Sequence, residues 1–177
     1  MVKTLPLVGF LTVLLTWKSS DSTTYRLTNV VCDSYNKSWV RINECRLKAI
    51  NRNRVIFNFN GTFVNPTNSI TMHSRMFKRE SGYKPWLIDT KINSCQFMIK
   101  PYNPFALFVY KLYKDFSNIN HTCPFYGDMI IKVMYLRPQI EALPFPSGDY
   151  LLAIEWLFYR RPQFSTNVSF QFVKNLI

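Results

Sequence analysis

Large apolar residues at alternate positions constrain the fold of this chain more than any other feature of its sequence. In residues 55–63 the phenylalanines stand at odd positions, and in residues 150–158 large apolar side chains stand at even positions. A period of two indicates β-strands with one buried face. The same alternation recurs at Ile70, Met72 and Met76, at Trp86, Ile88 and Ile92, at 129–135 and at 164–172. With a hairpin expected near residues 32–45, these segments predict a mainly β protein, a two-sheet sandwich or cup of about eight antiparallel strands.

One segment departs from this alternation and predicts a short helix. Asn103 is a good N-cap residue, and Pro104 suits the first helical position, where its missing N–H costs nothing. Apolar residues then follow at helical spacing, at Phe105, Phe108, Val109, Leu112 and Phe116. We expect one helix over about 104–116; the alternative interpretation is a further strand.

The first 22 residues have the pattern of a signal peptide. Lys3 supplies a positive charge, and residues 5–15 form an apolar run too short to span a bilayer, which takes roughly 20 apolar residues. The small residues Ser20 and Ser22 favour cleavage after Ser22; the alternative is an N-terminal membrane anchor. We therefore expect residues 23–177 to form a single secreted domain, with no later run apolar enough for stable membrane insertion.

The four cysteines predict two disulfide bonds and an oxidising compartment. Three pairings are possible for four cysteines. We expect Cys32–Cys45, because an antiparallel hairpin turning at residues 36–41 would bring these two opposite each other, and Cys95–Cys123 then follows by elimination. No C-x-x-C pair is present, so a zinc site or a redox site is not favoured.

Four N-glycosylation sequons, at Asn36, Asn60, Asn120 and Asn167, agree with secretion. Asn60 and Asn167 fall on the face of their predicted strands that is opposite the apolar one. Asn36 falls in the predicted turn, and Asn120 in a predicted loop. All four therefore occupy positions from which a glycan can project into solvent, and we expect a secreted glycoprotein.

The chain is basic. Its formal net charge of +12 becomes +11 when Lys3, Lys18 and Asp21 are removed with the leader. A basic surface attracts acidic glycans, anionic lipid or nucleic acid, and nucleic acid is the least expected of these partners outside the cell. The basic residues are dispersed, which favours a solvated positive surface over a dedicated site. They come closest together in three groups. The first contains Arg46, Lys48, Arg52 and Arg54, the second Lys78 and Arg79, and the third Arg160 and Arg161.

No pattern of catalytic residues is present, and we do not expect an enzyme, a metal or a cofactor. His73 falls on the polar face of its predicted strand, and His121 belongs to a sequon. The sequence has no nucleophile elbow, no zinc-binding H-E-x-x-H pair and no phosphate loop. Glu141, Asp149 and Glu155 are close in sequence but fall on different segments, and surface charges are a better interpretation of them than a hydrolytic pair.

The second half of the chain carries two motifs that resemble a known family. Residues 118–124 read N-x-N-x-x-C-P, and residues 146–150 read P-x-G-x-Y. Both match signatures of a large insect family of secreted proteins of unknown function that includes the chemosensory CheB proteins. The resemblance covers roughly residues 25–172. Ser94 departs from it, because the family usually has an acidic residue before the cysteine that corresponds to Cys95.

That family is in turn similar to the ML lipid-recognition domains, which include the ganglioside activator protein. The resemblance implies a β-cup whose sheets splay apart around an apolar cavity, and a carrier of a lipid-like or hydrocarbon-like ligand with a role in chemosensation or pheromone response. The alternatives are aromatics that pack without a cavity, and an extracellular module that recognises a receptor or an acidic glycan. Strand parity predicts as cavity-lining residues Phe57, Phe59, Tyr135, Leu152, Ile154, Trp156, Phe170 and Phe172.

Overall fold

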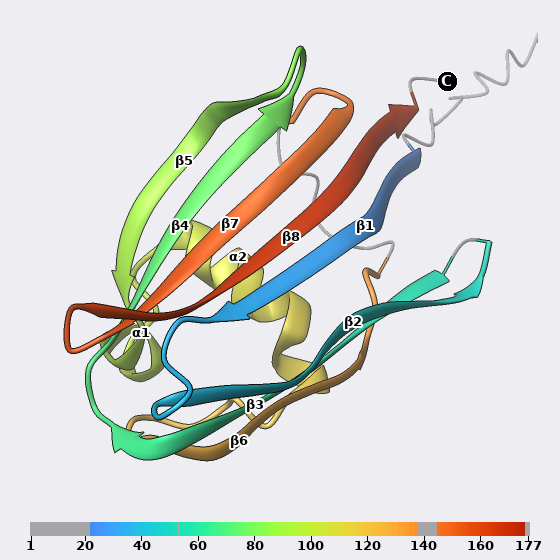
Figure 1. Cartoon of the computed structure of the whole chain (residues 1–177). Helices are drawn as coiled ribbons and strands as arrows, with labels where there is room; N and C mark the ends of the chain where they lie inside the picture. The colour runs from blue at the N-terminus through green and yellow to red at the C-terminus, as the bar shows by residue number, and fades with distance from the viewer. Residues whose placement is uncertain (1–21, 53, 138–144, 176–177) are drawn as a thin grey trace, which may run out of the picture.

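The computed structural model describes residues 22–52, 54–137 and 145–175 (Figure 1). Apart from Ser22, the predicted signal peptide lies outside the described residues. In the described part the chain forms eight strands, two α-helices and one 3-10 helix. In chain order they are β1 Ser22–Ser34, β2 Val40–Asn51, β3 Arg54–Thr67, β4 Ile70–Arg79, β5 Tyr83–Asn93, α1 Ser94–Ile99, α2 Pro104–Tyr113, η1 Lys114–Phe116, β6 Phe125–Met134, β7 Gly148–Phe158 and β8 Arg161–Asn175.

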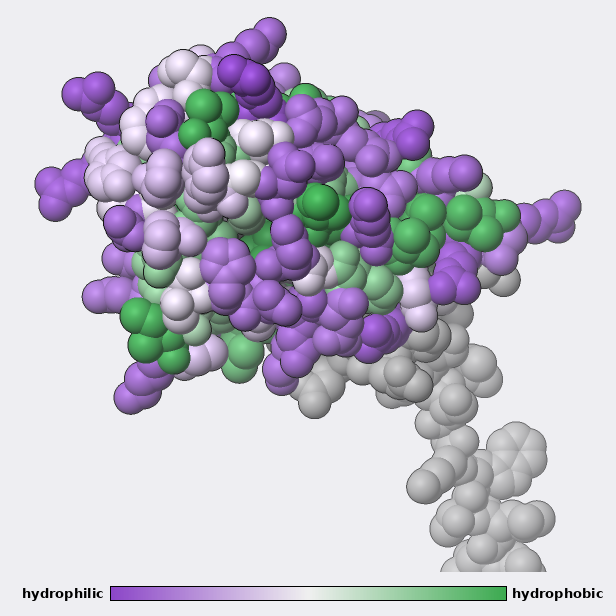
Figure 2. Space-filling model, turned by 90° about the horizontal axis from the view of Figure 1, so that it is seen from below, coloured by the Kyte–Doolittle hydropathy of each residue, from purple (hydrophilic) through white to green (hydrophobic). Residues whose placement is uncertain are grey.

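The strands form two antiparallel sheets, as the alternation of apolar residues predicts. The larger sheet has the strand order β1-β8-β7-β4-β5, and the smaller has the order β2-β3-β6. Their apolar faces point toward each other, so the predicted sandwich of eight antiparallel strands is confirmed. The outer faces are polar, and Figure 2 shows a largely hydrophilic surface on which hydrophobic residues occur in small separate groups. No helix in the described ranges is long and apolar enough to cross a membrane.

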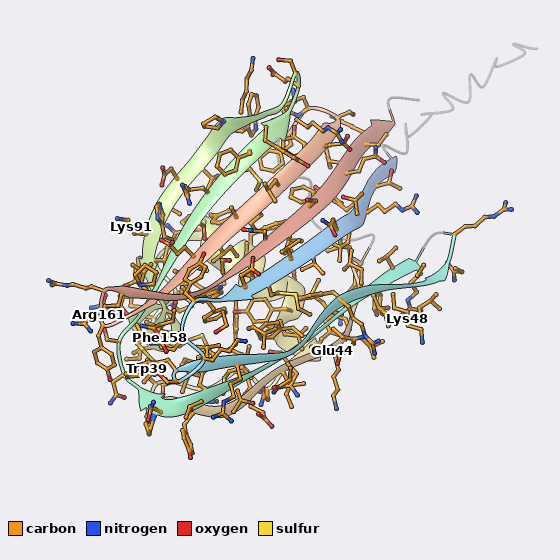
Figure 3. All side chains as sticks on the ribbon, in the orientation of Figure 1. Trp39, Glu44, Lys48, Lys91, Phe158 and Arg161 are labelled. Carbon is orange, nitrogen blue, oxygen red and sulfur yellow. A yellow bond between two sulfur atoms is a disulfide. The ribbon has the colours of Figure 1, made fainter. Side chains whose placement is uncertain are left out.

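The two sheets converge at one end and splay apart at the other (Figure 1). At the converging end, the Phe63 ring of β3 lies 5.0 Å from the Phe158 ring of β7, measured between centroids. Trp39, just before β2, lies 6.2 Å from Phe158 in the same way, and Figure 3 shows these two residues where the sheets meet. We call this region, Trp39, Val40, Phe63, Phe158 and Phe164, the closed end.

The predicted helix is confirmed in type and in its first residue. The Asn103 side chain accepts a hydrogen bond of 2.9 Å from the Ala106 backbone N–H, and Pro104 occupies the first turn of α2. The helix continues as the 3-10 helix η1 to Phe116, the predicted end. The expectation of a single helix was wrong, because α1 precedes it. Its six residues are too few to show a helical period, although Asn93 caps it by accepting 3.0 Å from Gln96 N–H.

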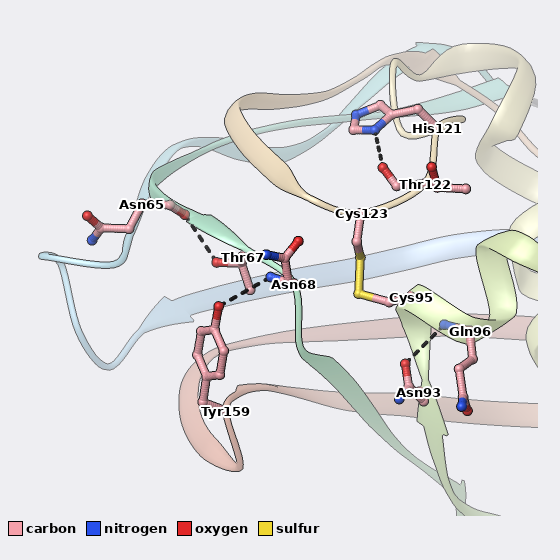
Figure 4. The surroundings of a disulfide bond; sticks show 10 residues. All are labelled: Asn65, Thr67, Asn68, Asn93, Cys95, Gln96, His121, Thr122, Cys123 and Tyr159. Carbon is pink, nitrogen blue, oxygen red and sulfur yellow. Dashed lines mark hydrogen bonds between the residues drawn. A yellow bond between two sulfur atoms is a disulfide. The ribbon is translucent and has the colours of Figure 1, made fainter.

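Both predicted disulfides are confirmed, but the hairpin used to predict the first does not exist. Cys32 on β1 and Cys45 on β2 are bonded, although β1 pairs with β8 and β2 pairs with β3, so the two strands belong to different sheets. The Cys95–Cys123 bond joins α1, directly after β5, to the loop before β6 (Figure 4). Each disulfide therefore connects one edge of the larger sheet to the neighbouring edge of the smaller one.

The predicted parity of β6 fails at its end. Met129 and Ile131 point inward as expected, but Val133 has a left-handed backbone, with φ of 54°, and is 52% exposed. Met134 is buried in its place, at 7% exposed. Because one irregular residue reverses the side-chain alternation of a strand, the inward parity expected for Tyr135 is lost with that of Val133.

Candidate ligand-binding cavity

An apolar cavity of about 230 Å³ lies between the sheets, next to the closed end. Phe63 and Phe164, which belong to the closed end, also line the cavity and form the wall between the two regions. Side chains of both sheets and of both α-helices complete its lining. Representative members are Met129 and Ile131 from the smaller sheet, Met72 and Leu152 from the larger sheet, and Phe97, Phe108 and Leu112 from the helices.

None of the described residues that line this cavity is charged. Of its few polar groups, the Thr166 hydroxyl already accepts a hydrogen bond of 3.1 Å from Trp156 Nε1. Burial of the Tyr113 hydroxyl raises its pKa above the ordinary value, and the neighbouring Tyr110 raises it further, so Tyr113 stays neutral at physiological pH. The cavity is therefore suited to an apolar ligand and offers nothing to balance a buried charge.

Side chains on the inner face of β8 show that the space is open. Phe164 at the closed end is buried, but Val168 and Phe170, further along the same face, are only half-buried. β8 lies between β1 and β7, so these two residues are not at a sheet edge. Both residues line the cavity, which accounts for their incomplete burial in the middle of the sheet.

Helix α2 forms one wall of the cavity. The apolar residues that predicted this helix supply Phe105, Phe108, Val109 and Leu112 to the lining. The helix contacts β6, while α1 before it contacts β4 and β5, so the helical segment spans from one sheet to the other along the edge opposite Cys32–Cys45. The Cys95–Cys123 disulfide closes the loop that contains α2.

Six of the eight residues predicted from strand parity line the cavity. They are Phe57, Phe59, Leu152, Ile154, Trp156 and Phe170. Tyr135 does not line it, because the irregular backbone at Val133 precedes it. Phe172 does not either: it is fully buried near the start of β1, with its ring 4.8 Å from that of Tyr25.

Strand parity missed the contributions of the helices and of several strand residues. The helical stripe of 104–116 was visible in the sequence, but nothing in the spacing showed which sheet surface it would cover. Phe97 and Met98 come from α1, for which there was no periodic signal. Met72 and Met129 carried the inward parity of their strands and could have been included on that ground.

The four sequons lie away from the cavity. Asn120 is exposed in the loop before Cys123, and Asn36 lies in the connection between β1 and β2. Asn60 on β3 accepts a hydrogen bond of 3.2 Å from Asn43, in a polar network on the outer face of the smaller sheet. None of the four side chains is fully buried.

The titratable side chains considered as catalytic candidates are dispersed. His73 bonds Asp89 at 2.7 Å on the larger sheet, and the exposed His121 bonds the Thr122 carbonyl in its own loop (Figure 4). Asp149 accepts a hydrogen bond from Gln171, and Glu141 lies outside the described residues. Within residues 22–52, 54–137 and 145–175, no three His, Cys, Asp or Glu side chains come together in a group that could hold a metal.

Comparison with known proteins gives one family match. Residues 72–152 match the family described as "Protein of unknown function (DUF1091)". The matched segment runs from β4 into β7 and includes both α-helices, both cysteines of the second disulfide and much of the cavity wall. No curated protein matches the chain. Over this segment, the chain is similar to a family whose function is uncharacterised.

Proposed function

We propose that this protein is a secreted carrier that binds one apolar, chain-shaped small molecule in the cavity between its sheets. The observation that carries the proposal is a cavity of about 230 Å³ whose described lining residues are all uncharged. Protein interiors ordinarily close-pack and leave few voids larger than a water molecule. A hollow of this size stabilises the free protein less than packed side chains would, which is the expected cost of holding a ligand.

The volume limits the ligand. A dry apolar cavity of about 150 Å³ takes up benzene, so by proportion this one suits a ligand of roughly ten carbon atoms. Phe, Met, Leu and Ile side chains dominate the walls, and their rotamers adapt to ligands somewhat longer than this. A medium-length acyl or hydrocarbon chain fits this description, in agreement with the lipid-recognition domains that the sequence resembles.

The compartment supports a carrier. The two disulfides are typical of an oxidising environment such as the extracellular space. The expected signal peptide and the four surface sequons add to this, and we therefore place the protein outside the cell as a glycoprotein. The resemblance to the CheB proteins makes chemosensation or pheromone response the physiological setting that we propose. We propose binding without catalysis, since the lining residues that the structure describes offer no acid–base pair.

Native mass spectrometry of the protein secreted from insect cells tests the proposal. We expect a mass excess that corresponds to one bound lipid-like molecule, lost on organic extraction and regained from a lipid extract. A single unliganded mass, with no uptake from the extract, would contradict carriage and leave the aromatics as an ordinary core.

A matched pair of variants on β8 assigns the binding to the cavity. Val168→Phe adds a ring inside the cavity, and Gln171→Phe adds the same ring on the exposed outer face of the same strand. We expect Val168→Phe to abolish uptake and Gln171→Phe to retain it. Equal uptake by both variants would place the bound molecule elsewhere.

A basic turn favours a second function, recognition of a receptor or an acidic glycan. The turn between β7 and β8 places Tyr159 and Arg160 in left-handed backbone, with φ of 48° and 66°, and both are exposed together with Arg161. Such conformations are costly for residues other than glycine and often mark functional positions. Salt elution from heparin tests this: loss of retention in Arg160→Ala/Arg161→Ala, but not in Lys48→Ala/Arg52→Ala, would support the turn, and equal losses would show only generic charge.

A further inference from the structure

A small polar pocket adjoins the apolar cavity near the start of β1. Its volume is about 30 Å³, enough for one or two waters or a group the size of a carboxylate. Tyr25, Leu27 and Leu136 line both the pocket and the cavity, so the two spaces share a wall. The remaining residues of the pocket are Arg26, Arg54, Val55 and Tyr135. The polar pocket therefore lies directly beside the cavity.

The Arg54 guanidinium is held in place by an aromatic ring. Its Cζ atom lies 3.9 Å from the centroid of the Tyr135 ring, a cation–π contact. Tyr135 in turn packs at 5.2 Å against the Phe116 ring of η1. When a guanidinium stacks by its flat face, its N–H groups still point outward in the plane of the group. Arg54 therefore remains able to donate the paired hydrogen bonds that bind a carboxylate.

The charges around this pocket favour an anion. Among the residues that the structure describes, two arginines and no acidic residue line it. Arg137 lies over the Phe116 ring and is paired with Asp115 at 3.0 Å. Arg46 is paired with Glu44 at 2.7 Å. Across the described part of the chain, neither Arg26 nor Arg54 forms an ion pair with a carboxylate.

We propose that Arg54, with Arg26 beside it, binds the anionic headgroup of an amphiphile whose apolar tail occupies the cavity. This rests on the proposed carrier function and specifies its ligand class: a medium-chain molecule with one compact anionic group, such as a fatty acid, in place of a neutral hydrocarbon. A compact anionic group matches the volume of this pocket better than a bulky phosphodiester headgroup does. The headgroup stays partly hydrated, since Arg26 and Arg54 are both exposed.

Competition between decanoate and 1-decanol for the delipidated protein tests this proposal. The two probes have the same chain length and differ in charge, and each displaces the neutral fluorophore N-phenyl-1-naphthylamine. We expect decanoate to bind about three- to tenfold more tightly, the range for a charge-assisted hydrogen bond weakened by exposure to solvent. The preference should fall as salt is added.

Two variants locate the headgroup. Arg54→Gln should lower the affinity for decanoate to that for decanol and leave decanol binding unchanged. Arg41→Gln, which removes an exposed charge from β2 of the same sheet, should retain the preference. Arg26→Gln provides a second variant and should reduce the preference in part. Thermal unfolding of each variant establishes that it is folded before binding is compared.

The outcomes separate this proposal from the carrier function. Equal affinities for decanoate and decanol in the wild-type protein would overturn the headgroup site while supporting carriage of neutral chains. A preference that survives Arg54→Gln, or one that Arg41→Gln abolishes equally, would also overturn it. Failure of both probes to bind would contradict the carrier function itself.

Discussion

Aromatic and aliphatic side chains face inward at both ends of the sandwich, but at the closed end their rings pack across the two sheets, whereas the other end holds the cavity. There, the Phe63 ring of the smaller sheet lies 5.0 Å from Phe158 and 5.8 Å from Phe164 of the larger one. At the cavity end, Phe170 stacks on Tyr150 at 5.5 Å. Both residues belong to the larger sheet, so this pair does not bridge the two sheets.

Chain connections account for the difference. At the closed end, two short connections pass between the sheets: residues 35–39 join β1 to β2, and residues 68–69 join β3 to β4. At the other end α2 lies along the open edge, and a helix with its side chains is about 10–12 Å across. Sheets in a sandwich ordinarily pack about 10 Å apart, so a helix beside the gap holds them further apart than direct packing requires. Residue type alone therefore does not decide whether an aromatic face packs or lines a cavity.

The largest contrast is expected from removing one aromatic ring at each end. Phe158→Ala opens a new cavity in a packed site and should lower the free energy of unfolding by about 3–5 kcal/mol. Phe170→Ala only enlarges an existing hollow and removes a half-buried ring, so we expect a loss of about 1–2 kcal/mol. Urea unfolding of both variants measures the difference. Equal losses would mean that Phe170 is as closely packed as Phe158.

The two disulfides are expected to differ in their effect on ligand binding more than on stability. Replacing either pair by alanines should lower the free energy of unfolding by about 2–4 kcal/mol, because the sequence separations of 13 and 28 residues differ too little to change the loop-closure entropy much. Only Cys95→Ala/Cys123→Ala should weaken ligand binding, since α2 lies within that loop and forms a cavity wall. Chemical denaturation and ligand displacement together test this. Equal weakening by Cys32→Ala/Cys45→Ala would show that both sheet edges shape the cavity.

The converse substitution, which adds a ring in place of a valine, should also distinguish the two ends. Val40 is 0% exposed, so Val40→Phe overpacks the closed end and should cost about 1–3 kcal/mol. Val168→Phe projects into the cavity and should change the free energy of unfolding by less than about 1 kcal/mol. Thermal unfolding of the ligand-free proteins measures both. A large loss in Val168→Phe would contradict an open cavity.

The smallest expected effect is a change in stability at high pH. Burial of the Tyr113 hydroxyl raises its pKa, with a further contribution from Tyr110, so the native state holds this proton more tightly than the unfolded chain does. This contribution to stability is complete below the unfolded pKa of about 10 and is lost as the pH rises above it. We expect the stability of Tyr113→Phe to fall less steeply than that of the wild type between about pH 10 and 11, measured by urea unfolding.

Tyr150 provides the control for that measurement. Burial also raises its pKa, but its hydroxyl donates a hydrogen bond of 2.6 Å to the Pro146 carbonyl. Tyr150→Phe should therefore lose about 1 kcal/mol at neutral pH as well. If Tyr113→Phe follows the wild-type pH profile, the Tyr113 hydroxyl is accessible to water.

Local patterns in the sequence predicted the elements of this fold well. The alternation in 150–158 predicted β7, and Asn103 with Pro104 predicted the start of α2, because a strand face and a helix cap each depend on a few neighbouring residues. The pairing of Cys32 with Cys45 was also correct, but it depended on a hairpin that does not form. A spacing of 13 residues allows the two cysteines to meet across sheets as readily as within one.

The cavity was harder to predict, because it depends on distances between elements. Parity identified Phe57 and Phe170 as inward-facing, but the same parity describes Phe158 and Phe172, which pack fully. The apolar stripe of α2 did not show which part of the sheets this helix would cover. A single left-handed residue, Val133, was enough to move Tyr135 from the predicted lining to the polar pocket beside it.

Crystals of the protein under xenon pressure would test the central difference between the two ends most directly, because xenon enters dry apolar cavities of this size. We expect density for xenon, or for a retained chain-shaped ligand, beside Val168 and Phe170, and none among Trp39, Val40 and Phe158. Absence of both, with Val168 and Phe170 in contact with side chains of the opposite sheet, would contradict the cavity and with it the proposed carrier function.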